Sequence, residues 1–465
     1  MLLAGYIPLT ISFQVHPINL PDIMMLLFML ITIISFALSS YKDVSFLGSE
    51  GWFVGFMTMI ICCVLYFLVS RLWKFRVIML YIALAVAAIV YILGILDRFS
   101  LYIIPLEIRD PSFISTIGNI NWFMGYYCIF TPIGVGLFLT DINFESNISI
   151  KEILLGAFVI ISFAAGIAQG SESVFLFFGA LFLGLAVLGQ LKVIKTRDIL
   201  LLIALGSLGG YIDHVLRVLH SEGYNYELDG LCARITLTPV LLLVFIISLT
   251  LWYVLVRIRR DIPSYLIYIL YGILFIAWLA IGILKARYGY FENLTNSMFL
   301  FNEHFGSGRG AAYKIGFEAF KNMSLREKIF GVGPDAFSAF IYGHETTNAM
   351  VMSVWPHDYL TNSHCELLTS MVNEGVLGVF AYIGIFGAFI GMSIRAVRMN
   401  ECADISEIEV GIKNREAVTI CALIALLAFC YMIHNFISFS QVLSTPFLFI
   451  MMGAGRAVFF DIEGL

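Results

Sequence analysis

Two side chains late in the chain, Arg309 and His364, have the chemistry that group transfer requires. Arg309 lies in SGRGAAYKIGFEAF, which starts at Ser307, and His364 lies in NSHCELLTSMVNEGVLG, which starts at Asn362. A guanidinium is a permanent cation that binds anionic oxygens in pairs, and a neutral imidazole can accept a proton. The two residues therefore indicate an anion holder and a general base.

Local helix signals predict the setting of both side chains. Ser363 and Glu366 fit the S-x-x-E capping box, which places His364 in the first turn of a helix, where the helix dipole lowers the pKa of the ring. Ser307 as an N-cap places Arg309 in a first turn as well, where a bound anion would offset the unfavourable dipole. The alternatives are that His364 only begins a helix and that Arg309 only reaches toward lipid headgroups.

The composition places the chain in a membrane. It has 465 residues, of which 60% are hydrophobic and 13% charged, and its mean hydropathy is +0.93. The net charge of −5 offers no basic surface for nucleic acid. The start MLLAGYIPLTISF lacks a charged region and a cleavage site, so no cleaved signal peptide is expected. The eight cysteines form no CxxC pair; Cys232 and Cys365 could pair, but two free thiols are the preferred prediction.

Twelve apolar runs are long enough to cross about 30 Å of hydrocarbon. We therefore predict an all-α, polytopic transmembrane helical bundle of about 12 spans. Three regions follow: an N-terminal bundle over 1–284, a long loop over 285–374 and C-terminal spans over 375–465. Residues 1–15 are predicted to lie at the interface or to insert halfway. The predicted spans are 22–40, 51–69, 77–96, 122–140, 152–170, 173–191, 199–217, 235–256, 264–284, 375–394, 417–437 and 442–460.

The distribution of basic residues predicts the orientation, because cytoplasmic loops are enriched in lysine and arginine. With a cytoplasmic N-terminus, both termini are inside and the long loop is extracytoplasmic, on a multi-pass protein of the plasma (inner) membrane. The inner loops then hold Arg71, Lys74, Arg76, Lys151, Lys192, Lys195, Arg197, Arg257, Arg259, Arg260, Arg395, Arg398, Lys413 and Arg415, and the short outer loops hold only Lys42, Arg98, Arg109, Arg217 and Arg234.

The long loop is predicted to contain helices of its own. Tyr313, Phe317 and Phe320 recur at i, i+4 and i+7, which predicts an amphipathic helix over 310–323 lying on the bilayer or on the bundle. Pro334, together with Gly331 and Gly333, predicts a turn of the chain after this helix.

Five further residues are candidate substrate-binding groups. Arg217 and Arg234 could add to an anion site, although each also fits an interface anchor. Asn121, together with Asn119, could bond a sugar or cap the helix that follows, of which the cap is preferred. Glu172 could also be only a turn residue. Asp335 directly follows Pro334 in the predicted turn. The sequence also contains His214, His220, His357 and His434 as lesser candidates.

With these residues assembled, the chain resembles the O-antigen polymerase/ligase family of membrane glycosyltransferases (Wzy- and WaaL-like). Three local matches carry the resemblance, in the family's order, on a chain with one long outer loop late in its sequence. They are GNINWFMGYY from Gly118, SGR at Ser307–Arg309 followed by GVGPDAF from Gly331, and His364 followed by Gly375 and Gly378.

The chain departs from the family's pattern at two positions. Cys365 follows His364 where the family has asparagine, and Glu172 in GSESVFLFFGA stands where the family has arginine. The second departure means that another cation, such as Arg217 or Arg234, would have to bind phosphate.

The resemblance implies a GT-C-like fold and polymerisation of oligosaccharide units carried on undecaprenyl pyrophosphate. Arg309 would stabilise the pyrophosphate leaving group, and His364 would take the proton from the attacking hydroxyl with inversion at the anomeric carbon. No cofactor is implied, and the absence of a DxD pair predicts metal independence. The implied partners are the lipid-linked glycan, the bilayer, and a chain-length regulator and a flippase of the same pathway.

Three other functions remain open on the sequence. A ligase would transfer the finished glycan to lipid A core or another acceptor. A transporter of lipid-linked oligosaccharide would need ionisable residues at mid-membrane, and few lie there. A structural membrane protein would make Arg309 and His364 incidental.

Overall fold

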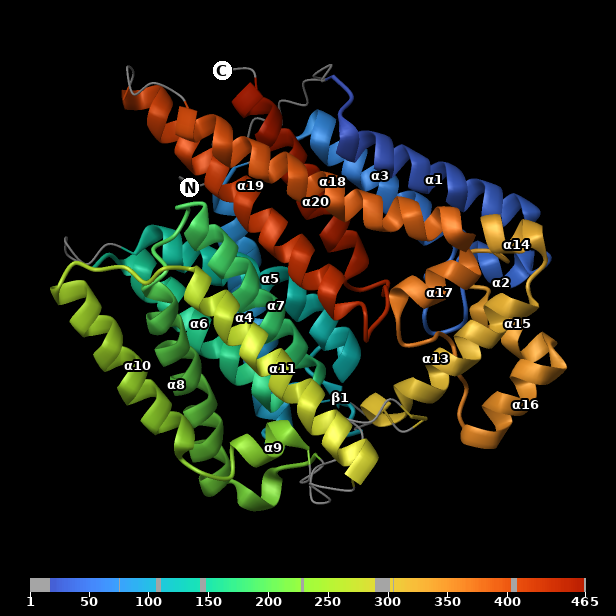
Figure 1. The fold of residues 1–465 in the computed structure, drawn as a ribbon, viewed down its shortest axis with the longest axis horizontal. Helices are drawn as coiled ribbons and strands as arrows, with labels where there is room; N and C mark the ends of the chain where they lie inside the picture. The colour runs from blue at the N-terminus through green and yellow to red at the C-terminus, as the bar shows by residue number, and fades with distance from the viewer. Residues whose placement is uncertain are drawn as a thin grey trace.

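The computed structural model describes residues 17–74, 76–105, 110–142, 148–226, 230–288, 302–303, 305–402 and 408–463. Within these ranges the chain is helical nearly throughout (Figure 1). The predicted interfacial segment 1–15 and the outer-loop residue Arg109 lie outside the described residues.

Each predicted apolar run coincides with one helix. The helices are α1 (Leu20–Leu38), α3 (Phe56–Leu72), α4 (Ile78–Arg98), α5 (Ile120–Asp141), α6 (Ile150–Ala168), α7 (Ser173–Gln190), α8 (Asp198–Leu219), α10 (Val240–Arg257), α11 (Tyr265–Tyr288), α18 (Gly375–Cys402), α19 (Ile408–His434) and α20 (Thr445–Glu463). Ten of them contain a segment long and apolar enough to cross a membrane, and α3 and α20 contribute shorter apolar segments. The prediction of an all-α, polytopic bundle is confirmed, and the count of twelve spans stays a prediction.

Helices α5 and α19 form the centre of the bundle. In α5, 94% of the most apolar segment is buried, against 67% in α19, whereas none of the corresponding segment of α11 is buried. Helix α5 packs against α6, α7 and α19, and α19 also packs against α7, α18 and α20. The ends of α5 and α19 are therefore fixed by several neighbours, which makes them firm supports for a site.

The described part of the long loop contains five helices, which lie at one end of the molecule beside α2 (Lys42–Leu47) (Figure 1). They are α13 (Phe305–Asn322), α14 (Leu325–Phe330), α15 (Phe337–Gly343), α16 (Glu345–Val354) and α17 (Glu366–Asn373). These helices share an apolar core of their own, which includes Ile315, Met323, Phe337, Phe340 and Val351. The loop is therefore a packed unit and not a bare connection.

The predicted helix over 310–323 exists, but its buried face is different. Ala312, Ile315 and Ala319 are buried, whereas Phe317 is 56% exposed. The small alanines let α13 lie close to α17, and Gly316 touches Leu368 of that helix. Phe317 instead points away from the loop core.

A sharp turn fixes the loop unit to the bundle. Gly331 and Gly333 have φ of +81° and +129°, and Gly375 at the start of α18 has φ of +73°, so the predicted turn around Pro334 is present. A side chain on Gly331 would overlap the carbonyl oxygen of Asn373. The hydroxyl of Ser39, just after α1, donates to Val332 O at 2.6 Å.

One small strand pair interrupts the helical pattern. β1 (Phe113–Ile114) pairs antiparallel with β2 (Gly118–Asn119), in the register Phe113↔Asn119 and Ile114↔Gly118. Asn119 then caps α5 by accepting the N–H of Asn121 at 2.8 Å. The capping interpretation of this motif is therefore confirmed.

The other end of the bundle holds a buried ion pair. Asp22 of α1 pairs with Arg456 of α20 at 3.2 Å and with Arg71 of α3 at 2.8 Å. The side chains of Asp22 and Arg456 are fully buried. These bonds join three helices, and they compensate charges that would be costly to bury unpaired.

Candidate functional site

Arg309 is held by backbone carbonyl groups and not by a carboxylate. Its Nε donates to Ile437 O at 2.9 Å, and its Nη1 donates to Gly306 O at 2.7 Å. Both acceptors lie on the protein backbone, so the guanidinium is oriented without an ion pair to a carboxylate of the described residues. Nη2 makes no hydrogen bond to any described residue. This arrangement suits binding of an external anion.

The segment 435–441, which connects α19 to α20, positions this arginine. It supplies the Ile437 carbonyl to Arg309 and the Phe436 carbonyl to the hydroxyl of Tyr313 at 3.2 Å. The N–H of Glu366, at the start of α17, donates to Asn435 O at 2.9 Å. The same connection therefore holds both α13 and α17 against the bundle.

His364 lies two residues before α17 and not in its first turn. Helix α17 begins at Glu366, and Cys365 at its N-cap makes no side-chain cap. The predicted capping box is wrong, because the Ser363 hydroxyl donates to Cys365 O at 2.9 Å and lies 2.9 Å from Thr369 Oγ1. The predicted N-cap at Ser307 is also wrong, since α13 already begins at Phe305.

The backbone of His364 has a left-handed conformation, with φ of +54°. Its N–H donates to Asn362 Oδ1 at 2.9 Å, and its ring packs edge-on against Phe439 at 5.5 Å between centroids. The ring atom Nδ1 is buried and has no hydrogen-bond partner. A strained, oriented histidine with a free ring nitrogen is typical of functional sites.

Electrostatics connects the two residues. Burial, and then the charge of Arg309, lowers the pKa of His364 to about 4. The predicted neutral ring is therefore present, although its cause is burial and a neighbouring cation instead of a helix dipole. Burial also lowers the pKa of Arg309, while nearby Tyr313, Glu172 and Tyr226 raise it. Residues 55 positions apart thus lie within each other's field.

His434 is a second ring at this site, which the sequence marked only as a lesser candidate. It ends α19, and its Nε2 lies 3.3 Å from the hydroxyl of Ser173. Its Nδ1 is buried without a partner, and it lies within the field of Arg309. Its position near the end of the predicted span 417–437 was its only sequence signal, and that signal does not distinguish a site residue from a helix end.

Arg98 was predicted only as an outer-loop cation, but it is fully buried. Its guanidinium donates to Ala168 O and Gln169 O, each at 2.7 Å, and lies 4.4 Å from the ring centroid of Tyr226. Since Tyr226 also acts on Arg309, Arg98 fixes the C-terminal end of α6 beside the site. The local sequence does not indicate that Arg98 is buried, because the burial arises only when segments that are distant in the sequence pack together.

The other predicted cations have different surroundings. Arg217 donates to Ala233 O at 2.6 Å and to Thr236 Oγ1 at 3.0 Å, and it lies over the ring of Tyr224 at 4.4 Å. Arg234 is exposed. Arg217 therefore secures the segment between α8 and α10, and its part in anion binding stays a prediction, as does that of Arg234.

Asn121 and Glu172 are both linked to the site, Asn121 by a hydrogen bond and Glu172 by its charge. The carbonyl of Asn121 accepts the side-chain amide of Gln441 at 2.9 Å, which ties α5 to the 435–441 connection. Glu172 accepts the N–H of Leu231 at 2.8 Å and acts on Arg309 at longer range. Where the family pattern has a cation, this chain thus places an anion that partly balances Arg309.

Asp335 secures a turn of the bundle. Its carboxylate accepts the N–H groups of Ser49 at 2.7 Å and Val54 at 3.4 Å. Burial raises its pKa to about 7, against the effect of these two hydrogen bonds. Its first role is therefore to hold the loop unit to the 49–54 segment.

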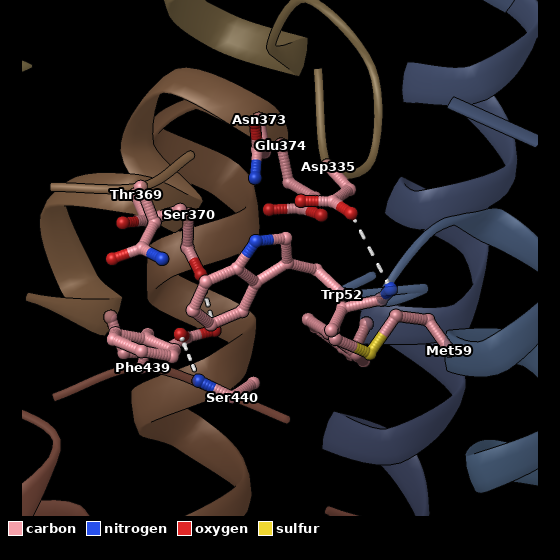
Figure 2. Close-up of a pocket in the computed structure, with 13 residues that line it drawn as sticks. Trp52, Met59, Asp335, Thr369, Ser370, Asn373, Glu374, Phe439 and Ser440 are labelled. Carbon is pink, nitrogen blue, oxygen red and sulfur yellow. Dashed lines mark hydrogen bonds between the residues drawn. The ribbon is translucent and has the colours of Figure 1, made fainter. Parts of the chain in front are cut away.

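A small cavity next to His364 contains three carboxyl groups (Figure 2). Figure 2 shows the side chains of Asp335 and Glu374 beside Trp52, with Phe439 on the opposite side. The third group, Glu366, accepts the N–H of Ser440 at 2.6 Å. Burial raises the pKa of Glu366 and of Glu374.

The volume of this cavity, about 30 Å³, limits what it can hold. That is room for about one water molecule and far less than a sugar ring needs. Phe439 forms a common wall, because its ring contacts both His364 and Trp52. The cavity as it stands in this structure is therefore too small to hold a sugar ring.

The described part of the chain contains neither a group of metal-binding side chains nor a pair of bonded cysteines. No group of three or more His, Cys, Asp or Glu residues there could hold a metal ion. Cys232 and Cys365 are both free thiols, as the sequence predicted. What the site offers is an oriented cation with an open donor beside a neutral imidazole.

Comparison with known proteins does not identify the chain: no protein-family model and no curated protein matches it. The geometry of Arg309 and His364 therefore carries the functional interpretation.

Proposed function

We propose that this protein is a membrane glycosyltransferase that polymerises oligosaccharide units carried on a polyprenyl pyrophosphate. The observation that carries the proposal is the meeting of Arg309 and His364. The arginine keeps Nη2 free of described partners, and its charge helps to lower the pKa of the histidine. A cation beside a neutral base suits a reaction in which an anion leaves and a hydroxyl loses its proton.

The proposed reaction is a single displacement. The oxygen of an acceptor hydroxyl attacks the anomeric carbon, the bond from that carbon to the pyrophosphate oxygen breaks, and the electron pair leaves with the pyrophosphate. Arg309 stabilises the charge on this leaving group, which is worth about 2.7–4 kcal/mol for a well-placed donor. His364 takes the hydroxyl proton, and attack opposite the leaving group inverts the anomeric carbon.

Binding of the donor substrate would itself change the pKa of His364. A pKa of about 4 makes His364 a weak base in the free protein. A pyrophosphate bound to Arg309 would offset the positive field at the ring, so the pKa of His364 would rise toward its ordinary value. The base would thus gain strength when the donor is in place.

Reconstitution of the purified protein with a synthetic undecaprenyl-pyrophosphate repeat unit tests the proposal. The expected result is a ladder of longer glycans that is unchanged by a chelator, since the proposed reaction uses no metal. Loss of the ladder with EDTA would contradict the metal-independent reaction. A protein that makes no ladder but transfers the glycan to added lipid A core would be a ligase, which contradicts polymerisation while keeping the same site.

A further inference from the structure

Two adjoining cavities lie at the end of the bundle opposite the candidate site. They have volumes of about 580 Å³ and 430 Å³, and both are lined by Lys192, Val193 and Arg415. Arg415 and His434 are at opposite ends of one span of 20 residues, which separates them by about 30 Å. These cavities are therefore distinct from the site at Arg309 and His364.

The acidic side chains of the larger cavity already have partners. Asp141 pairs with Lys151 at 2.7 Å, and Asp198 accepts the indole N–H of Trp252 at 2.9 Å. Asp261 accepts the backbone N–H groups of residues 196 and 197 at 3.2 Å and 2.6 Å. Asp198 also lies 3.9 Å from Nε of Arg197. Two of these three carboxylates therefore each have a basic side chain of their own, outside the set Lys192, Lys195 and Arg415.

The basic side chains have no such partners. Lys192, Lys195 and Arg415 are exposed and make no ion pair with another described residue. Lys192 and Arg415 lie where the two cavities join, and Lys195 lines the larger one. The positive charge of this end therefore remains available to an anion.

The smaller cavity continues into apolar surface. Leu191, Val193, Val397 and Val418 line it, next to Lys192 and Arg415. Val397 and Val418 belong to α18 and α19, so the apolar wall follows two spans. A free phosphate would gain nothing from this wall, whereas a lipid would bury an acyl chain against it.

We propose that these two cavities bind one anionic phospholipid. The phosphate lies between Lys192 and Arg415, the polar headgroup extends into the larger cavity toward Lys195, and an acyl chain follows the smaller cavity along α18 and α19. Basic pockets between spans are suited to anionic headgroups. The proposal does not depend on glycosyl transfer.

The test is the thermal stability of the full-length protein in detergent, titrated with phosphatidylglycerol or with phosphatidylcholine. A given rise in melting temperature is expected to need less phosphatidylglycerol than phosphatidylcholine. The difference in concentration should be roughly fivefold for each cation that contacts the lipid. Lys192→Gln with Arg415→Gln is expected to abolish the preference. Lys192→Arg with Arg415→Lys, which keeps both charges, is expected to retain it.

Lys74→Gln with Arg76→Gln is the matched control, because both residues are exposed, neither lines the cavities, and the change in charge is the same. This variant is expected to keep the preference. Equal responses of the wild-type protein to the two lipids, or equal loss in the control, would overturn the proposal. Stabilisation by inorganic phosphate equal to that by phosphatidylglycerol would overturn it in favour of a soluble anion.

Discussion

Arg309 and His364 are each fixed in position by backbone groups while their functional atoms stay open. Two carbonyl groups orient the guanidinium, and a left-handed turn closed by Asn362 orients the imidazole. The sequence alone was sufficient to select Arg309 and His364 as candidate site residues. The basis of the histidine's neutrality could not be predicted in this way, because it arises from packing and from a cation 55 residues away.

The pH dependence of the proposed transfer should report this environment. A base with a pKa of about 4 is deprotonated at neutral pH, so kcat/KM should stay level as the pH falls and decline only near pH 4, instead of near the usual histidine value of about 6.5. The decline in kcat should occur at higher pH, since bound pyrophosphate offsets Arg309. A decline in kcat/KM at about pH 6.5 would contradict this environment for His364.

Asp335 should make stability depend on pH. Its folded-state pKa is raised to about 7, above the value of about 3.9 in an unfolded chain. The unfolded chain therefore releases this proton first, and the stability associated with it is lost as the pH rises from about 4 to about 7, by up to about 1.4 kcal/mol per pH unit.

Asp335→Asn, which keeps an acceptor for the N–H of Ser49, should reduce this loss in thermal unfolding measured across that range. Asp43→Asn on α2 is a matched control, because Asp43 is exposed. An unchanged pH profile in Asp335→Asn would show that Asp335 does not titrate in this way.

At the scale of elements, the apolar runs predicted the positions of the long helices well, whereas local capping patterns predicted the helix starts less well. The capping box of α14, from Ser324 to Glu327, is real, but the same pattern at Ser363 is not used. A serine hydroxyl can donate to nearby carbonyls as readily as it accepts a helix N–H. The face of α13 was also missed, since close contact with α17 favours small residues over Phe317.

The turn at Gly331 is the element on which positioning of the loop depends. Gly331→Ala would place a methyl group against Asn373 O at a φ of +81°, so we expect a loss of roughly 1–3 kcal/mol in stability and a lower melting temperature. Gly387→Ala in α18, where no atom lies within 4 Å of the added carbon, is the matched control. Equal melting temperatures for Gly331→Ala and the wild-type protein would contradict this role of the turn.

At the scale of the molecule, the candidate site and the basic cavities lie at opposite ends of the spans. Among the described residues, ten helices of sufficient length and two shorter apolar ones are consistent with a multi-pass membrane protein. The charge bias of the connecting loops then predicts that the Arg309 end is extracytoplasmic.

Cysteine labelling should distinguish the two ends. In a background with Cys365→Ser and Cys402→Ser, Arg326→Cys on the exposed part of α14 should react with a membrane-impermeant maleimide in intact cells. Arg260→Cys, exposed after α10, should react only after permeabilisation. The reverse pattern would show that the predicted orientation is wrong.

The most direct test of the central claim is the rate of glycan extension by His364→Ala, Arg309→Gln and the double variant in reconstituted membranes. If both residues act on one transition state, each single change should slow extension by about 10²-fold or more, and the double change should add little. His220→Ala, exposed at the end of α8, should extend glycans normally. Extension at the wild-type rate by His364→Ala would contradict the account.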